Sequence, residues 1–180
     1  FSAQSEAKES DGDVYEKRGN IFLQLEEKIT QLTSTGRDSE PVLSPDGRWI
    51  AFNREIEGKV KECSEGHDLW ACPSDPLWII NLETQTEKML LEPRREDKDI
   101  KKVIYHFKNK TFSPNSKTIY FITPAYAVSD AIHSVDTDEK NDRYVTDGNT
   151  LQVINEPLSP DIKEYLSESL QEDDWRIYPK

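Results

Sequence analysis

The sequence predicts an all-β fold built from repeated antiparallel units of four strands. From Gly19 onward, short apolar runs alternate with turn-forming residues, a pattern typical of strands joined by tight turns. Two segments, Leu43–Phe52 and Phe112–Phe121, each contain a Ser-Pro turn followed by a strand-like run, and they are identical at four of ten positions. Hydrophobic residues make up 34% of the chain and charged residues 32%, which favours thin sheets over a thick two-sided core.

Residues 1–18 are expected to form a mobile arm. They are rich in Ser, Glu, Lys, Asp and Gly, so they cannot bury enough apolar surface to offset the entropy of ordering. Val14 and Tyr15 are the side chains that could hold the end of this arm against the body of the protein.

The first unit comprises an outer hairpin followed by two inner strands that meet in a tight turn. Pro45 fixes φ at the second position of this turn, and Gly47 tolerates the positive φ that reverses the chain. The expected strands are Asn20–Leu25, Lys28–Thr33, Glu40–Leu43 and Trp49–Asn53, with the turn at Ser44–Gly47.

A similar order returns after a long insertion, Arg54–Pro76. The charged segment Pro93–Lys102 is expected to be a loop, and the second Ser-Pro turn lies at Ser113–Ser116. The expected strands of this part are Leu77–Leu82, Thr86–Leu91, Lys110–Phe112, Thr118–Thr123, Ala131–Val135 and Asp142–Thr146.

The spacing of these elements indicates a structural repeat. The two Ser-Pro turns lie 69 residues apart, and the three outer hairpins begin near Asn20, Pro76 and Asp130, at spacings of 56 and 54 residues. Propeller blades repeat about every 40 to 50 residues, and here the insertion and the charged loop carry the surplus. Because one blade buries too little surface alone, blades stack. The prediction is therefore about two to three propeller-like four-stranded antiparallel blades over residues 19–150.

The motifs of the first unit resemble the repeat of the TolB-type β-propellers. The matching residues are Leu32-Thr33, Glu40-Pro41, Ser44–Gly47 and Ile50–Phe52. The resemblance covers roughly residues 19 to 148 and is weaker in the second copy, where Asn115-Ser116 replaces Asp-Gly and no Leu-Thr precedes the turn. It implies either exported bacterial proteins that bind other proteins in the cell envelope or non-catalytic domains attached to peptidases.

The expected blade count is smaller than the closed ring of about six blades that the resemblance implies. Three explanations remain open: an open fan of blades, a fragment of a longer propeller, or a homodimer in which two chains complete one ring. The tail, residues 151–180, is expected to be helical or capping. Ser159-Pro160-Asp161 repeats the turn motif and could begin another blade, but it also suits the start of a short helix that continues with Ile162, Tyr165, Leu166 and Leu170 at helical spacing.

Cys63 and Cys72 lie nine residues apart in the polar insertion. Such a pair in one surface loop predicts a disulfide in an exported protein, and two unrelated thiols in a cytosolic protein are the alternative. A zinc site is not expected, because only His67 lies nearby and a structural site takes about four Cys or His ligands.

Loop residues are the candidate binding site. Trp70 and His67 lie in the cysteine loop, and Tyr126 follows Pro124 in a loop-like stretch. Exposed aromatic side chains on loops often anchor interfaces. Trp70 packing over its own blade is the alternative.

No catalytic residues, metal or cofactor are predicted. The chain lacks the Gly-x-Ser-x-Gly elbow of serine hydrolases, a phosphate loop and a dinucleotide fingerprint. Two of the three histidines, His106 and His133, are expected to line strands or surface. Asp136–Asp142 places oxygen ligands at alternate positions, but Lys140 interrupts the calcium-loop pattern, which favours an acidic turn.

The net charge of −12 argues against nucleic acid and anionic membranes as partners. No run approaches the roughly 18 apolar residues of a membrane-spanning helix. The predicted function is a non-catalytic protein–protein interaction module of the TolB-like type, periplasmic or secreted. The alternatives are the non-catalytic propeller portion of a larger peptidase-type enzyme and a propeller that binds carbohydrate or another small ligand.

Overall fold

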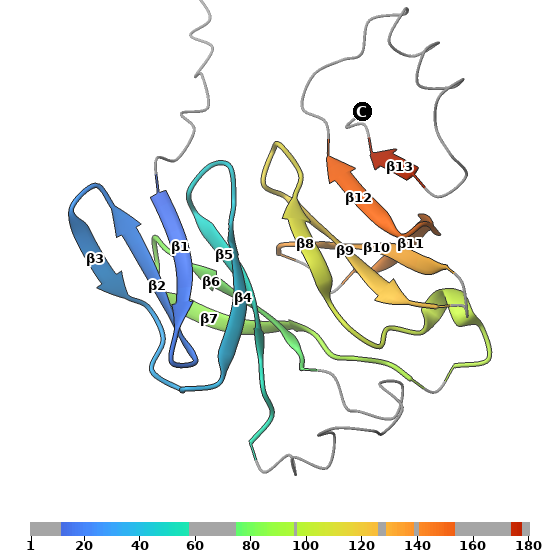
Figure 1. The fold of residues 1–180 in the computed structure, drawn as a ribbon, viewed down its shortest axis with the longest axis horizontal. Helices are drawn as coiled ribbons and strands as arrows, with labels where there is room; N and C mark the ends of the chain where they lie inside the picture. The colour runs from blue at the N-terminus through green and yellow to red at the C-terminus, as the bar shows by residue number, and fades with distance from the viewer. Residues whose placement is uncertain are drawn as a thin grey trace, which may run out of the picture.

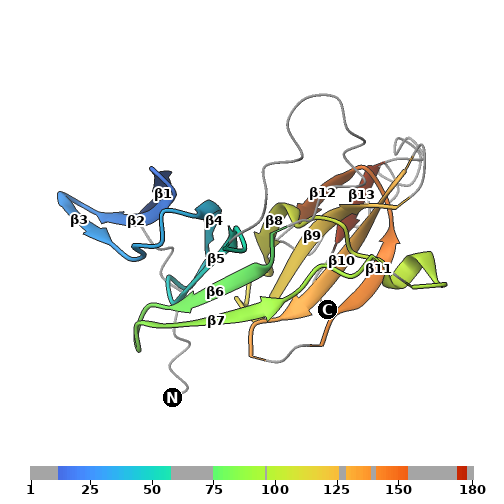
Figure 2. The same cartoon turned by 90° about the horizontal axis from the view of Figure 1, so that it is seen from below.

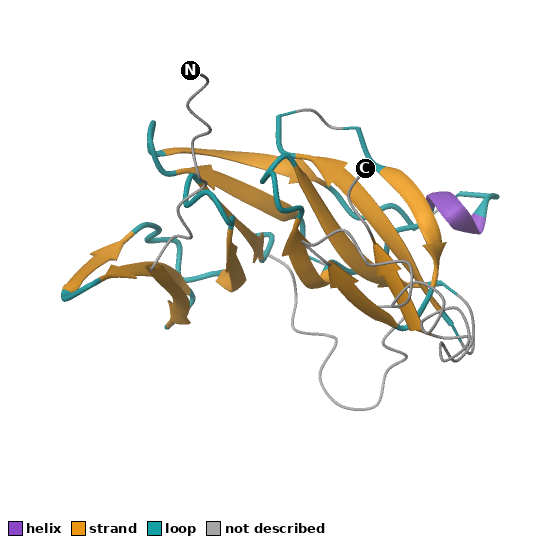
Figure 3. Cartoon of the chain, turned by 90° about the horizontal axis from the view of Figure 1, so that it is seen from above, coloured by secondary structure: helices purple, strands orange, loops and turns teal. Residues whose placement is uncertain are grey.

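The computed structural model describes residues 12–57, 75–95, 97–125, 129–138, 141–153 and 174–177. Strands dominate this part of the chain, and the three-residue 3-10 turn η2 is its only helical element (Figure 3). The elements are β1 (Gly12–Lys17), β2 (Asn20–Leu25), β3 (Lys28–Gln31), β4 (Asp38–Leu43), β5 (Trp49–Arg54), β6 (Leu77–Asn81), β7 (Thr86–Leu91), η2 (Ile100–Lys102), β8 (Lys108–Phe112), β9 (Thr118–Pro124), β10 (Asp130–Asp136), β11 (Arg143–Asp147), β12 (Thr150–Val153) and β13 (Asp174–Ile177).

The strands form consecutive antiparallel sheets. Strands β4-β5-β6-β7 make the first blade and β8-β9-β10-β11 make the second blade, each with its strands in chain order. Strands β1-β2-β3 form a three-stranded N-terminal sheet, and β12 pairs with β13 in parallel. The N-terminal sheet, the first blade and the second blade follow one another from one end of the molecule to the other (Figures 1 and 2). The predicted all-β fold of propeller-like four-stranded blades is confirmed.

The two Ser-Pro turns have the same hydrogen bonds. In the first, Ser44 Oγ donates to Asp46 Oδ1 (2.7 Å) and accepts from the Trp49 N–H (2.9 Å). In the second, Ser113 Oγ donates to Asn115 Oδ1 (2.7 Å) and accepts from the Thr118 N–H (3.0 Å). Each serine is buried, so its hydroxyl supplies hydrogen bonds to the turn that water cannot supply there.

Both inner strands carry a bulge that the sequence does not reveal. Glu40 in β4 and Asn109 in β8 have φ of 50° and 49°, and the pairing register of each strand shifts at that point. Left-handed conformations are uncommon for residues other than glycine. The two positions lie 69 residues apart, as the two turns do, so the repeat extends through the whole inner strand.

An apolar cluster joins the N-terminal sheet to the first blade. Ile21 from β2 packs with Ile50 and Phe52 from β5 and with Ile80 from β6. Ile21, Ile50 and Phe52 are fully buried. Val14 from β1 packs against the same cluster, as expected for this residue from the sequence.

A larger cluster joins the two blades. Ala51 and Ile79 of the first blade face Ile119 and Phe121 of the second. Phe107 packs on Phe121 with ring centroids 5.0 Å apart. Ala51 lies between Ile50 and Phe52 on β5, so alternate residues of this strand enter different clusters.

A buried ion pair lies at the C-terminal end of β5. Arg54 donates to both carboxylate oxygens of the fully buried Asp38, at 2.5 and 3.0 Å, and its guanidinium lies 2.7 Å from Glu87. Burial by itself would lower the pKa of Arg54, but the bonds to the two carboxylates raise it overall. The guanidinium also lies over the Trp78 ring, 4.5 Å from its centre.

Two terminal regions differ from the sequence prediction. Residues 12–17 of the predicted arm form β1, because Val14 packs inward and Tyr15 stacks on Phe22. At the other end, Thr150–Val153 and Asp174–Ile177 are strands, and the predicted helix from Ser159 lies outside the described residues.

His133 is a core histidine. Its side chain is fully buried against the rings of Phe121 and Tyr144, and neither ring nitrogen has a hydrogen-bond partner among the described residues. Burial lowers the pKa of His133 from 6.5 to about 4. The imidazole is therefore neutral in the folded protein at pH 7.

Removing either turn hydroxyl should lower stability. Ser44→Ala and Ser113→Ala each leave a partly buried N–H without its acceptor, so we expect each to lower the free energy of unfolding by about 1 to 2 kcal/mol in denaturant titrations. Ser34→Ala, at an exposed position, is the matched control. Equal effects of all three substitutions would show that the turn bonds do not stabilise the blades.

Replacing His133 should change the pH dependence of stability. Because its pKa is lower folded than unfolded, the unfolded chain takes up the proton first as the pH falls below 6.5. The wild-type protein should therefore lose about 2 kcal/mol between pH 7 and pH 5 relative to His133→Leu. Urea unfolding of both proteins across this range measures the difference. Parallel curves would contradict a buried neutral histidine.

Candidate functional site

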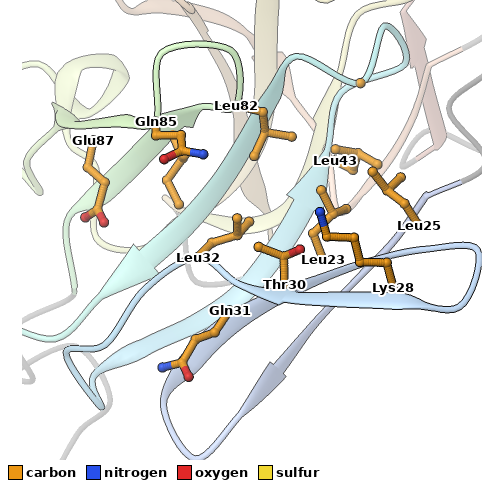
Figure 4. Close-up of a pocket in the computed structure, with 12 residues that line it drawn as sticks. Leu23, Leu25, Lys28, Thr30, Gln31, Leu32, Leu43, Leu82, Gln85 and Glu87 are labelled. Carbon is orange, nitrogen blue, oxygen red and sulfur yellow. The ribbon is translucent and has the colours of Figure 1, made fainter.

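A groove of about 470 Å³ lies between the β2–β3 hairpin and the first blade. We call it the hairpin groove (Figure 4). Its lining combines aliphatic residues from several strands with polar residues at the rim. The lining residues are Leu23, Leu25, Lys28, Thr30, Gln31, Leu32, Leu43, Gly47, Ile80, Leu82, Gln85 and Glu87.

Strand alternation explains which side chains reach the groove. Leu23 and Leu25 of β2 lie opposite Thr30 and Lys28 of β3 in the antiparallel register, so all four share the face that looks toward the first blade. The facing wall comes from the first blade, where Ile80 lies on the corresponding face of β6. The groove is thus the open continuation of the apolar cluster between the two sheets.

The groove has an aliphatic floor and a charged rim. Leu25, at one end of the groove, is 49% exposed. Lys28 has no ion-pair partner among the described residues, whereas Glu87 is already bound to Arg54. The rim therefore offers one available positive charge beside apolar surface.

Strand β3 adds an open backbone edge to the groove. It pairs with β2 alone among the described strands. The Leu32 N–H donates to the Ile21 carbonyl at 2.8 Å, which sets the phase of the ladder. By alternation, the backbone groups of Ile29 and Gln31 point away from β2. These backbone groups can form hydrogen bonds with another extended strand.

A smaller polar cavity of about 190 Å³ lies where the blades meet. The buried Lys110 ammonium donates to Glu40 Oε2 (2.9 Å) and to the Phe107 carbonyl (3.1 Å), and Asn53 donates to the same carboxylate (3.3 Å). Burial lowers the pKa of Lys110, and the Glu40 carboxylate opposes that shift. These bonds connect β4 and β5 to the second blade, which gives the cluster a structural role.

The residues predicted as binding site and disulfide lie outside the described part of the chain. These are Trp70, His67, Tyr126, Cys63 and Cys72, and they stay predictions. His106 lies beside the polar cavity.

The acidic turn binds cationic side chains. Asp136 pairs with Arg143 at 3.1 Å, and Arg94 pairs with both oxygens of Asp142. The bonds from Arg94 lower the pKa of Asp142. Within the described ranges, no cluster of three or more His, Cys, Asp or Glu residues is arranged to hold a metal ion.

The hairpin groove was not among the predicted sites. The available signal was Leu25, an apolar residue that directly precedes the charged turn Glu26-Glu27 and is 49% exposed. Its exposure depends on how far the hairpin stands from the first blade, which the local pattern does not specify.

No protein-family model and no curated protein sequence matches the chain. Among solved structures, the Agrobacterium tumefaciens protein assigned as TolB aligns with a TM-score of 0.48 and 19% identity, over 72% of this chain and 41% of its own. TolB from Acinetobacter baumannii aligns with a TM-score of 0.47 and 14% identity, over 77% of this chain and 31% of its own. The β-propeller domain of the Trilobed protease from Pyrococcus furiosus aligns with a TM-score of 0.44 and 17% identity, over 71% of this chain and 33% of its own. The chain thus spans less than half the length of each of these structures. In its described part, no helix is long and apolar enough to cross a membrane.

Proposed function

We propose that this chain is a non-catalytic, propeller-like module that binds another protein through the hairpin groove. The observation that carries the proposal is the juxtaposition of an aliphatic groove with the unpaired edge of β3. An extended segment of a partner can hydrogen-bond to that edge and place alternate side chains in the groove, which is strand-addition binding.

The groove specifies the kind of segment it would accept. Its floor suits a branched aliphatic side chain, since Leu23, Leu43 and Leu82 line it from three parts of the chain (Figure 4). Lys28 at the rim favours an acidic side chain next to the aliphatic one. The preferred partner segment is therefore an extended strand with an aliphatic and a neighbouring acidic residue.

The proposal includes a place in the bacterial envelope, either periplasmic or secreted. Its support is the resemblance of Leu32-Thr33, Ser44–Gly47 and Ile50–Phe52 to the TolB-type repeat. Trp70, His67 and Tyr126 are proposed as a second contact region, and a Cys63–Cys72 disulfide would stabilise the loop that carries two of them. A small apolar ligand is the second candidate, because about 470 Å³ lies within the volume range of ligand pockets.

Site-specific crosslinking tests the protein-binding proposal. A photoreactive benzoylphenylalanine at Thr30, which faces the groove, should form adducts with one partner protein in intact cells. The same residue at Val145, exposed on β11, is the control and should not form that adduct. An adduct at both positions, or at neither, would contradict the proposal.

Filling the groove should then abolish binding to the crosslinked partner. Thr30→Trp places an indole over the aliphatic floor, so we expect at least a tenfold, or about 1.4 kcal/mol, loss of affinity in titration calorimetry. Val145→Trp should bind as the wild-type protein does. Unchanged binding by Thr30→Trp would assign the partner to another surface. If Thr30→Trp instead loses binding to a small apolar probe and keeps its affinity for the partner, the small-ligand candidate is favoured.

A further inference from the structure

The outer face of the N-terminal sheet carries an apolar stripe. Val14, Ile21 and Leu23 point toward the first blade, so the residues between them point the other way. On that outer face, Tyr15 of β1 is paired directly with Phe22 of β2. Their rings stack with centroids 5.6 Å apart and planes 11° apart.

The stripe continues onto β3. Ile29 lies opposite Gln24 in the register and is 56% exposed, the highest value among the large apolar residues of the described chain that face water. Tyr15, Phe22 and Ile29 therefore cross all three strands. In Figure 2 this sheet is the last layer at its end of the molecule, and no labelled strand lies beyond it.

This face differs from the sheet faces that pack between the described layers. Apolar side chains from both sides fill the space between the N-terminal sheet and the first blade and the space between the two blades. A terminal layer in a stacked protein normally has a polar outer face, which keeps it in solution. Here the centre of the terminal face is aromatic and aliphatic, as in the internal layers.

The charges around the stripe are arranged symmetrically. On β1, Asp13 and Lys17 flank Tyr15 at equal spacing, and all three point outward. Neither Asp13 nor Lys17 has an ion-pair partner among the described residues. Consider a two-fold axis that lies between the faces of two copies, passes Tyr15 and reverses the strand direction. It places Asp13 of each copy opposite Lys17 of the other, which makes two such pairs.

The neighbouring strand repeats this symmetry. On β2, Asn20 and Gln24 flank Phe22, and both amides can donate and accept hydrogen bonds. The same axis places Asn20 of one copy opposite Gln24 of the other. A surface that complements itself under a two-fold rotation is what an isologous dimer requires.

We propose that the outer face of the N-terminal sheet binds the same face of a second copy of this chain. Tyr15 and Phe22 form the apolar centre, Ile29 flanks it in the row of Gln24, and the reciprocal Asp13–Lys17 pairs set the antiparallel orientation. The hairpin groove lies on the opposite face of the sheet, so the dimer and the proposed partner binding are separate properties.

Sedimentation equilibrium of the 180-residue chain tests this interface. The wild-type protein should be a dimer at micromolar concentration in 0.15 M salt, where the Debye length of about 8 Å screens the repulsion between two copies of charge −12. Tyr15→Ala should weaken the dimer about a hundredfold, because the residue lies at the interface centre in both copies. Circular dichroism confirms that the variant is folded.

A charge exchange identifies the partner surface. Asp13→Lys and Lys17→Asp should each weaken the dimer about tenfold, since each places like charges opposite each other. Mixing the two variants restores both attractive pairs and should restore the dimer as a heterodimer. Lys108→Asp, on an exposed position of β8, should leave the wild-type dimer unchanged.

Three results would overturn the proposal. A wild-type monomer at micromolar concentration shows that no such interface forms, and another protein or a chain segment that precedes β1 is then the candidate occupant of this face. A dimer unaffected by Tyr15→Ala uses another surface. Charge variants that stay monomeric when mixed show that Asp13 and Lys17 do not face each other across a two-fold axis.

Discussion

The burial of both faces of the first blade is the constraint on which the rest of the described structure depends. Successive residues of β5, Ile50, Ala51 and Phe52, are all fully buried, yet they enter two different clusters. Such a strand cannot stand at the surface of a protein, because each buried aliphatic or aromatic side chain contributes about 1.5 to 3 kcal/mol of transfer free energy. The first blade is stable only with a layer on each side.

Polar contacts then fix how the layers meet. The Asp46 N–H donates to Ser116 Oγ at 3.1 Å, so the first Ser-Pro turn is bonded to the second. Lys110 reaches across from the second blade to Glu40 at the bulge of β4. Both contacts use residues that only the repeat brings together, 70 positions apart in sequence. They favour one arrangement of the blades over others with equal apolar burial.

Much of this fold could be predicted because its signals are local. Asn20–Leu25 and Thr86–Leu91 were expected with the observed bounds, since alternation and flanking turn residues define such strands. The turns at Ser44 and Ser113 were visible for the same reason. Strand β1 was missed because its apolar content is small and its order depends on the distant Ile50 and Phe52. The bulges at Glu40 and Asn109 place residues other than glycine in left-handed conformations, and the strand pattern of the sequence does not locate them. The hairpin groove was missed because it results from the separation of two sheets.

Native-state hydrogen exchange tests the layered arrangement most directly. If the first blade is held between two layers and β3 is an open edge, the amides of Ile50, Ala51 and Phe52 exchange only through the largest unfolding transition. The amides of Ile29 and Gln31 then exchange close to the rate of an unstructured peptide. Slow exchange at Ile29 and Gln31, or fast exchange throughout β5, would contradict this account.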